Sequence, residues 1–176
     1  MFDPEDGSLC NFGDTCGTHL LRKLTQGGEK QQIVGQSELL PCLAVKDIWP
    51  EKFRDRLVTW FIDNDAARHC LIKGGSPTKE SAWLATRFWE TELEAGCHSW
   101  FERVPSPSNP ADDPSHGKPP EKLRGTASRC SQLPDNFEEQ LCVSWTQQMG
   151  ASHPRRGKAV LLRGALRRQL RLKPRR

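Results

Sequence analysis

These 176 residues lack the patterns typical of membrane-spanning helices, zinc sites and secretory signal peptides. No run of 18 apolar residues occurs, so no membrane-spanning helix is expected. The seven cysteines form no C-x-x-C pair, and His69, His98 and His116 have no H-x-H or H-x-x-x-H spacing, which argues against a zinc site. The scattered thiols, and the acidic start "MFDPEDGSLC" without a signal-peptide pattern, indicate an intracellular location, in the nucleus or cytoplasm.

Apolar residues are also scarce, and acidic residues are missing from one end of the chain. The hydrophobic fraction is 35% and the mean hydropathy is −0.69, enough for a core of roughly 100 residues. Residues 151–176 hold ten of the 26 Lys and Arg and no acid, which leaves 16 basic against 22 acidic residues before them, a balance of −6. We expect a domain over residues 1–116, a disordered polar linker over 117–150 and a basic tail over 151–176.

The expected elements alternate between strands and helices. Residues 56–63, "RLVTWFID", predict an interior strand covered on both faces. Apolar residues recur at helical spacing after Ser37, which we expect to be an N-cap, and again over residues 76–95, where Gly96 ends the helix. The aromatic residues of this second helix, and of the strand that follows it, are expected in the core. The order predicts an α/β fold.

Three segments in this order resemble the ribonuclease H domain of retroelement reverse transcriptases. They are "GQSELLPCLAV" (35–45), "VTWFIDNDAARHCLIKG" (58–74) and "WFERVPSPSNPADDPSH" (100–116). Similar domains have Glu-Leu at the start of a helix, Asp-Asn closing a central strand, and a stretch with Asn, Ala-Asp and Ser after the last strand. The resemblance implies a ribonuclease H-like mixed sheet flanked by helices, N-terminally truncated because the family's first strand has no counterpart, with a disordered or helical basic tail.

The resemblance also implies a chemistry, the hydrolysis of RNA in RNA–DNA hybrids with Mg²⁺ or Mn²⁺. In this family carboxylates hold two ions about 4 Å apart, and Glu38, Asp63 and Asp112 match such catalytic and metal-ligand positions. No small-molecule cofactor is implied. The family's fourth carboxylate, on the first strand, is not matched by Asp3 or Asp6, and the family's usual Arg is replaced by His116. The expectation is therefore a degenerate nuclease domain with a weak metal site and little turnover.

Nucleic acid is the expected partner, either an RNA–DNA hybrid or a non-specific one. Arg68 and Lys73 follow the acidic strand end and would contact phosphates. Basic residues of the tail would add affinity; they include Arg155, Arg156, Arg167 and Arg168. A non-catalytic nucleic-acid-binding fragment that relies on this tail is the alternative function. The tail, with its leucines on one side of a helical pattern, equally fits an anionic membrane surface or an unselected disordered end.

Each site residue has a local alternative. The strand-end sequence Asp63-Asn64-Asp65 also fits a simple turn before the next helix. In that turn we expect the side chain of Asp65 to cap the helix. Glu38 fits an acid near a helix N-terminus, and Asp112 fits a proline-flanked turn. Arg68 and Lys73 are equally explained as exposed residues of a helix. A further alternative is that the chain forms no stable domain, because the absent strand would leave sheet edges unpaired.

Overall fold

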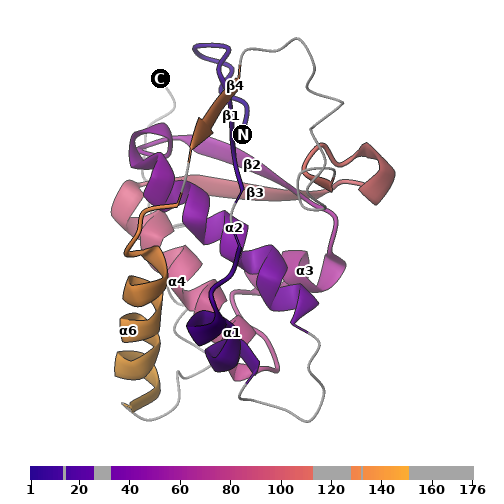
Figure 1. The fold of residues 1–176 in the computed structure, drawn as a ribbon. Coiled ribbons are helices and arrows are strands. Elements are labelled where there is room, and N and C mark those ends of the chain that lie inside the picture. The colour runs from indigo at the N-terminus through magenta and orange to yellow at the C-terminus, as the bar shows by residue number, and fades with distance from the viewer. Residues whose placement is uncertain (14, 26–32, 113–127, 132, 151–176) are drawn as a thin grey trace.

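A computed structural model describes residues 1–13, 15–25, 33–112, 128–131 and 133–150 of the chain. Helices are interspersed with short strands through these residues (Figure 1). In chain order the elements are β1 (Leu9–Phe12), α1 (Thr18–Thr25), α2 (Val34–Ile48), η1 (Pro50–Lys52), β2 (Leu57–Ile62), α3 (Asp65–Lys73), α4 (Lys79–Ala95), β3 (His98–Arg103), η2 (Ser106–Ser108), β4 (Ser128–Ser131) and α6 (Phe137–Gly150). The α/β class is confirmed.

The described strands form two separate parallel pairs. β2 pairs with β3 in a register that runs from Leu57↔His98 to Ile62↔Arg103, and β1 pairs with β4. The antiparallel contact among the described residues is an isolated bridge between Phe2 and Leu9. The sequence predicted a single mixed sheet, which these strands do not form. Because β2 and β3 are parallel, their carboxyl ends meet at the same edge.

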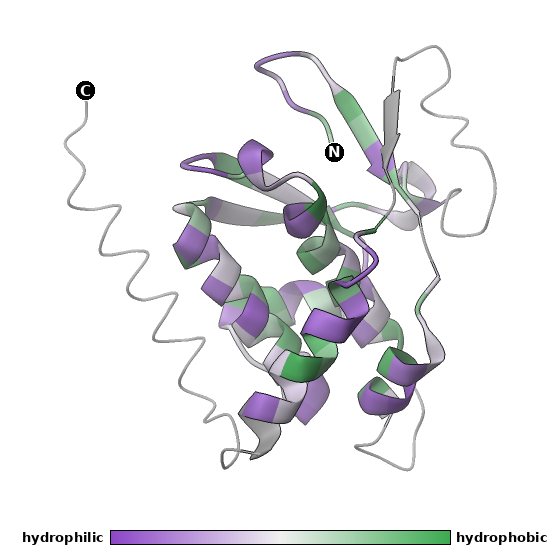
Figure 2. Cartoon of the chain, turned by 60° about the vertical axis from the view of Figure 1, so that its left-hand side comes forward, coloured by the Kyte–Doolittle hydropathy of each residue, from purple (hydrophilic) through white to green (hydrophobic). Residues whose placement is uncertain are grey.

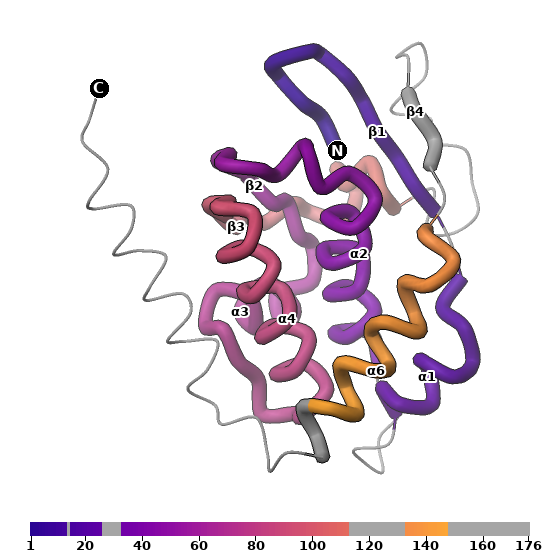
Figure 3. The backbone as a smooth tube through the Cα atoms, turned by 90° about the vertical axis from the view of Figure 1, so that its left-hand side faces the viewer, coloured from indigo at the N-terminus to yellow at the C-terminus, as the bar shows by residue number. Residues whose placement is uncertain are grey.

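The helices α2, α3 and α4 pack on one side of the β2–β3 pair (Figures 1 and 3). Apolar and polar stretches alternate along these helices (Figure 2), the amphipathic pattern of helices that bury one side. The expected stripe of α4 is confirmed, since Trp83, Leu84 and Phe88 are fully buried. Helix and sheet therefore share one core.

The helix starts differ from those expected, because side-chain caps do not mark all of them. α2 begins at Val34 without a side-chain cap, so Ser37 lies inside the helix. Asn64, rather than Asp65, caps α3, and its Oδ1 accepts a hydrogen bond of 3.0 Å from the N–H of Ala67. Gly96 ends α4 as expected, in the left-handed conformation with φ of 64°.

Strand β2 is covered on one face, not on both as the sequence predicted. Its burial alternates along the strand, and Leu57 and Phe61 are 82% and 65% exposed. On β3, Trp100 is 66% exposed, whereas the other aromatic residues expected in the core are buried. A continuous apolar run is typical of a strand that is covered on both faces of its sheet. Here the described helices pack against one face of the β2–β3 pair alone.

Helix α6 (Phe137–Gly150) lies within residues 117–150, for which we expected a disordered linker; residues 117–127 and 132 are outside the described part of the chain. Phe137, Leu141 and Cys142 are buried in the main hydrophobic core. Trp145 meets Trp83 of α4 edge to face, with ring centroids 5.0 Å apart. Phe137, Leu141 and Trp145 recur every four positions, a helical spacing that the polar residues before them kept from being recognised. The helix is part of the domain because it supplies core residues.

Two further findings concern membrane-spanning helices and the cysteine thiols. No helix among the described residues is long and apolar enough to cross a bilayer. The six cysteines whose side chains are described are free thiols, and all of them except Cys16 are buried. Burial raises the pKa of Cys42 and of Cys97 to about 12, so these thiols stay protonated and poorly nucleophilic at neutral pH.

A candidate carboxylate site at the end of strand β2

Asp63 lies where β2 ends and before α3 begins, at the edge shared by the carboxyl ends of β2 and β3. Its side chain is half-buried. Asn109, in the loop after β3, donates a hydrogen bond of 3.1 Å from Nδ2 to Asp63 Oδ2. The loop turns back on itself, because the N–H of Asp112 donates to the carbonyl oxygen of Asn109 at 3.3 Å. This loop brings Asp112 to the same edge.

Glu38 approaches this edge from helix α2. It is half-buried in the second turn of the helix. Burial raises the pKa of Glu38, and the negative charges of Asp63 and Asp112 raise this pKa further. The pKa is raised, whereas a carboxylate favoured by the helix dipole would have it lowered. Asp63 and Asp112 are therefore close enough to Glu38 to affect its charge, although Glu38 and Asp112 are 74 positions apart in the sequence.

The three carboxylates have the chemistry of a magnesium site but not a closed geometry. Mg²⁺ and Mn²⁺ favour carboxylate oxygens, and Mg²⁺ keeps several waters, so few protein ligands suffice. In the described part of the chain, however, no three His, Cys, Asp or Glu side chains are grouped closely enough to hold a metal ion as they stand. Mutual repulsion opposes a closer approach. The residues fit the ion in type and charge, and the site is open.

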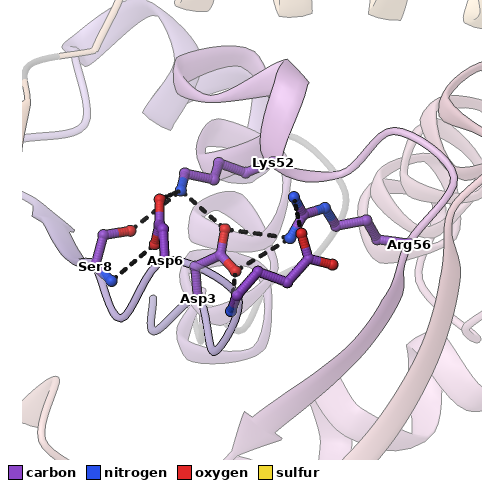
Figure 4. A network of polar contacts seen from close by, with 6 residues as sticks. Asp3, Asp6, Ser8, Lys52 and Arg56 are labelled. Carbon is purple, nitrogen blue, oxygen red and sulfur yellow. Dashed lines mark hydrogen bonds and ion pairs between the residues drawn. The ribbon is translucent and has the colours of Figure 1, made fainter.

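Asp3 and Asp6 do not join this site, because basic side chains hold them elsewhere. Lys52 contacts Asp3 Oδ2 at 2.8 Å and Asp6 Oδ2 at 2.5 Å, and Arg56 contacts Asp3 Oδ1 at 3.1 Å (Figure 4). The hydrogen bond from Lys52 is the main reason that the pKa of Asp3 is lowered. This network ties the N-terminal turn to η1 and the segment that follows it, and so has a structural role.

Cationic side chains near the site are partly neutralised. Arg68 pairs with Asp65 at 3.0 Å, and Arg103 reaches the same carboxylate at 3.6 Å. The hydrogen bond from Arg68 is the largest cause of the lowered pKa of Asp65. Lys73 is exposed at the last residue of α3. The other predicted phosphate contacts lie outside the described residues; they are Arg155, Arg156, Arg167 and Arg168.

Two residues at this edge were not predicted from the sequence. Asn109 orients Asp63, and Arg103 pairs with Asp65. Asn109 belongs to the segment that resembles the family's closing stretch, so its position carried a signal. Arg103 had none, because its relevance depends on the parallel register that puts it opposite Ile62.

Replacing Glu38 by Gln should raise the melting temperature of the metal-free domain at pH 7, by about 2–4 °C. The raised pKa means that folding disfavours the charged form of Glu38. The stability that Glu38 contributes is therefore present below its ordinary pKa and is lost as pH rises through the raised value. The gain from Gln should be largest at neutral pH and vanish in acid. Thermal melts in EDTA at several pH values measure it.

Added Mg²⁺ should make the melting temperature of wild type higher than that of Glu38→Gln, the reverse of the order in EDTA. The reason is that wild type gains stability by binding the ion and Glu38→Gln gains less. Glu139→Gln, which removes an exposed carboxylate of α6, is the matched control and should change neither melt. A lower melting temperature for Glu38→Gln at neutral pH in EDTA would contradict the repulsion at this site. A cooperative melt of wild type excludes a chain that forms no stable domain.

Comparison of the chain with protein-family models, with curated proteins and with solved structures finds no match.

Proposed function

We propose that this chain is a degenerate ribonuclease H-like nuclease domain, which binds Mg²⁺ or Mn²⁺ through Glu38, Asp63 and Asp112. Its substrate is the RNA strand of an RNA–DNA hybrid. The observation that supports this above all is that carboxylates from α2, from the end of β2 and from the loop after β3 lie near one another, where burial and then the charges of Asp63 and Asp112 raise the pKa of Glu38. Carboxylates that repel one another across a domain destabilise it, and a divalent cation offsets that repulsion. Such clusters are frequent at functional sites.

Each side chain has a distinct part in this proposal. Asp63 is oriented by its hydrogen bond from Asn109 at the end of a paired strand. Glu38 comes from helix α2, and Asp112 comes from the loop after β3. Bound divalent cations supply the activation of a water and the stabilisation of the leaving oxygen. With three carboxylates rather than the family's four, turnover is expected to be slow.

The nucleic acid would approach over α3. Lys73 is exposed there, and Arg68 is available to a phosphate once its pairing with Asp65 is exchanged. The basic residues of the tail add attraction that weakens with salt. An intracellular location, in the nucleus or cytoplasm, accords with such a substrate.

A second candidate is a non-catalytic nucleic-acid-binding domain. The observation that favours it is the open spacing of the carboxylates, since no three ligands among the described residues are grouped around a common point. In this case the fold and the basic residues supply affinity, and Glu38, Asp63 and Asp112 perform no hydrolysis.

A cleavage assay on an RNA–DNA hybrid with Mg²⁺ or Mn²⁺ separates the two. We expect wild type to cleave the RNA strand slowly, and Asp63→Asn to fall to the level measured in EDTA. Asp135→Asn removes an exposed carboxylate outside the site and should cleave like wild type. If all three proteins bind the hybrid and none cleaves it, the nuclease proposal is wrong and the binding role remains.

A further inference from the structure

Two of the free cysteines, Cys16 and Cys142, lie where α1 meets α6. The two helices pack beside each other (Figures 1 and 3), and Lys23 Nζ of α1 donates a hydrogen bond of 3.2 Å to Thr146 Oγ1 of α6. Cys16 lies two residues before α1 and is exposed, whereas Cys142 lies in α6 and is 5% exposed. An accessible thiol and a buried one thus belong to the same helix contact.

Contacts of the neighbouring residues hold Cys16 close to Cys142. The N–H of Gly17 donates a hydrogen bond of 2.5 Å to Oε1 of Glu138. A Cβ at Gly17 would overlap the same carboxylate, so this close approach needs a glycine. Glu138 and Cys142 are four positions apart on α6, where side chains share one face and their Cβ atoms are about 5–6 Å apart. The chain at Cys16 is therefore placed about one helical turn from Cys142.

The electrostatics of the two thiols support this proximity. Burial raises the pKa of Cys16, and the negative charges of Glu138 and of Cys142 raise it further. Burial also raises the pKa of Cys142, where Lys23 opposes the shift and Glu138 adds to it. Both thiols therefore lie near the same carboxylate, and Cys142 lies near enough to Cys16 to affect its charge.

We propose that Cys16 and Cys142 are a redox-controlled pair, which a small disulfide such as that of glutathione converts into a bond between α6 and the segment before α1. The accessible Cys16 thiolate attacks one sulfur of the small disulfide, forms a mixed disulfide and releases one glutathione thiolate. The Cys142 thiolate then attacks the sulfur of Cys16 and releases the second. The protein loses two protons and two electrons, and one glutathione disulfide becomes two glutathione thiols.

The bond fastens α6 to the rest of the domain. Cys16 and Cys142 are 126 positions apart, so the disulfide closes a long loop and restricts the unfolded chain. The helix that it holds carries Phe137 and Leu141 of the main core. Oxidation therefore stabilises the packing of α6, and reduction releases it, as in the transient disulfides of reducing compartments. The proposal is independent of the proposed nuclease activity.

Equilibration of the full chain with mixtures of reduced and oxidised glutathione tests the pairing. Equilibrium is measured rather than rate, because the raised pKa of Cys16 makes the first attack slow at neutral pH. Alkylation and peptide mapping identify the joined cysteines, and the redox midpoint gives the effective concentration of one thiol at the other. We expect an intramolecular bond from Cys16 to Cys142, with an effective concentration at least about tenfold higher in the folded chain than in concentrated urea.

The same ratio sets the gain in stability, so the oxidised chain should melt about 3–5 °C higher for each tenfold. Cys16→Ser, which changes an exposed residue, should abolish the bond and leave the melt of the reduced chain unchanged. A bond from Cys16 to another cysteine, a product that is mainly a covalent dimer, or equal effective concentrations with and without urea would overturn the proposal.

A matched pair of variants tests the contact that brings the thiols together. Glu138→Ala removes the acceptor of the Gly17 N–H and should lower the effective concentration severalfold. Glu139→Ala removes the adjacent, exposed carboxylate of α6 and should leave it unchanged. If both variants keep the effective concentration of wild type, the contact between Gly17 and α6 does not position Cys16, and the proposal is wrong.

Discussion

Lys46→Met should destabilise the domain by about 3–5 kcal/mol, as expected when one partner of a buried ion pair is removed. Lys46 and Glu92 are both buried, and the Lys46 ammonium contacts Glu92 Oε1. Lys46 Nζ also lies 3.4 Å from the carbonyl oxygen of Phe88 and 3.3 Å from Thr91 Oγ1, and it sits 3.6 Å from the centre of the Phe88 ring. Burial lowers the pKa of Lys46, and Glu92 opposes that shift.

The loss comes from the carboxylate that remains. Glu92 Oε2 is buried and already has no hydrogen-bond partner, so without Lys46 the charge is uncompensated. Urea unfolding should therefore show a much lower midpoint for Lys46→Met at pH 7.

Two control variants make this result specific. Lys46→Met with Glu92→Leu removes both charges and should recover most of the stability, because an apolar pair replaces a buried ionic one at little or no loss. Arg87→Ala breaks the more exposed pair with Glu90 and should cost less than about 1 kcal/mol. If Lys46→Met unfolds within about 1 kcal/mol of wild type at pH 7, the buried pair is not as described.

Phe137→Ala and Leu141→Ala should each lower the free energy of unfolding by about 2–5 kcal/mol, the usual loss for truncating a buried side chain. Both residues are buried in the main core from α6. Helix α6 also packs beside α1, and the carboxylate of Glu138 accepts a hydrogen bond of 2.5 Å from the N–H of Gly17. Removing these side chains opens a cavity between α6 and the rest of the domain.

The same helix supplies the control for this prediction. Val143 is 49% exposed, so Val143→Ala should change the free energy of unfolding by no more than about 0.5 kcal/mol. Urea unfolding of the three variants measures the contrast. Equal, small effects for all three would mean that α6 does not pack on the core and that residues 117–150 behave as the linker expected from composition.

The candidate site remains a prediction that rests on three sequence segments. Glu38, Asp63 and Asp112 were chosen because they match three segments in order, and in the structure burial and then the charges of Asp63 and Asp112 raise the pKa of Glu38. Their roles as metal ligands remain predictions. The local details were less accurate: Asn64 caps α3 in place of Asp65, and α2 begins three residues before Ser37. Either Asn or Asp suits an N-cap, so residue type could not choose between neighbours.

The misassigned regions share a cause. Residues 137–150 were assigned to a linker together with the polar, Pro- and Gly-containing residues before them, although Phe137, Leu141 and Trp145 recur every four positions. Strand β2 looked doubly covered because most of its residues are apolar. In both cases burial depends on segments distant in sequence. Trp100 illustrates this, since it is exposed although Trp83 and Trp89, of the same residue type, are buried.

The sequence by itself determined the α/β class, the positions of most helices and strands, and the separation of an acidic body from a basic tail. These follow from local periodicity, turn residues and charge, which act over a few positions. Only the tertiary structure decided that two parallel strand pairs form, that α6 contributes to the core, and that Asn109 orients Asp63. It also decided that the described helices cover one face of β2 and β3 and not the other. Those outcomes depend on which surfaces meet, and side chains far apart along the chain meet only when the fold brings them together.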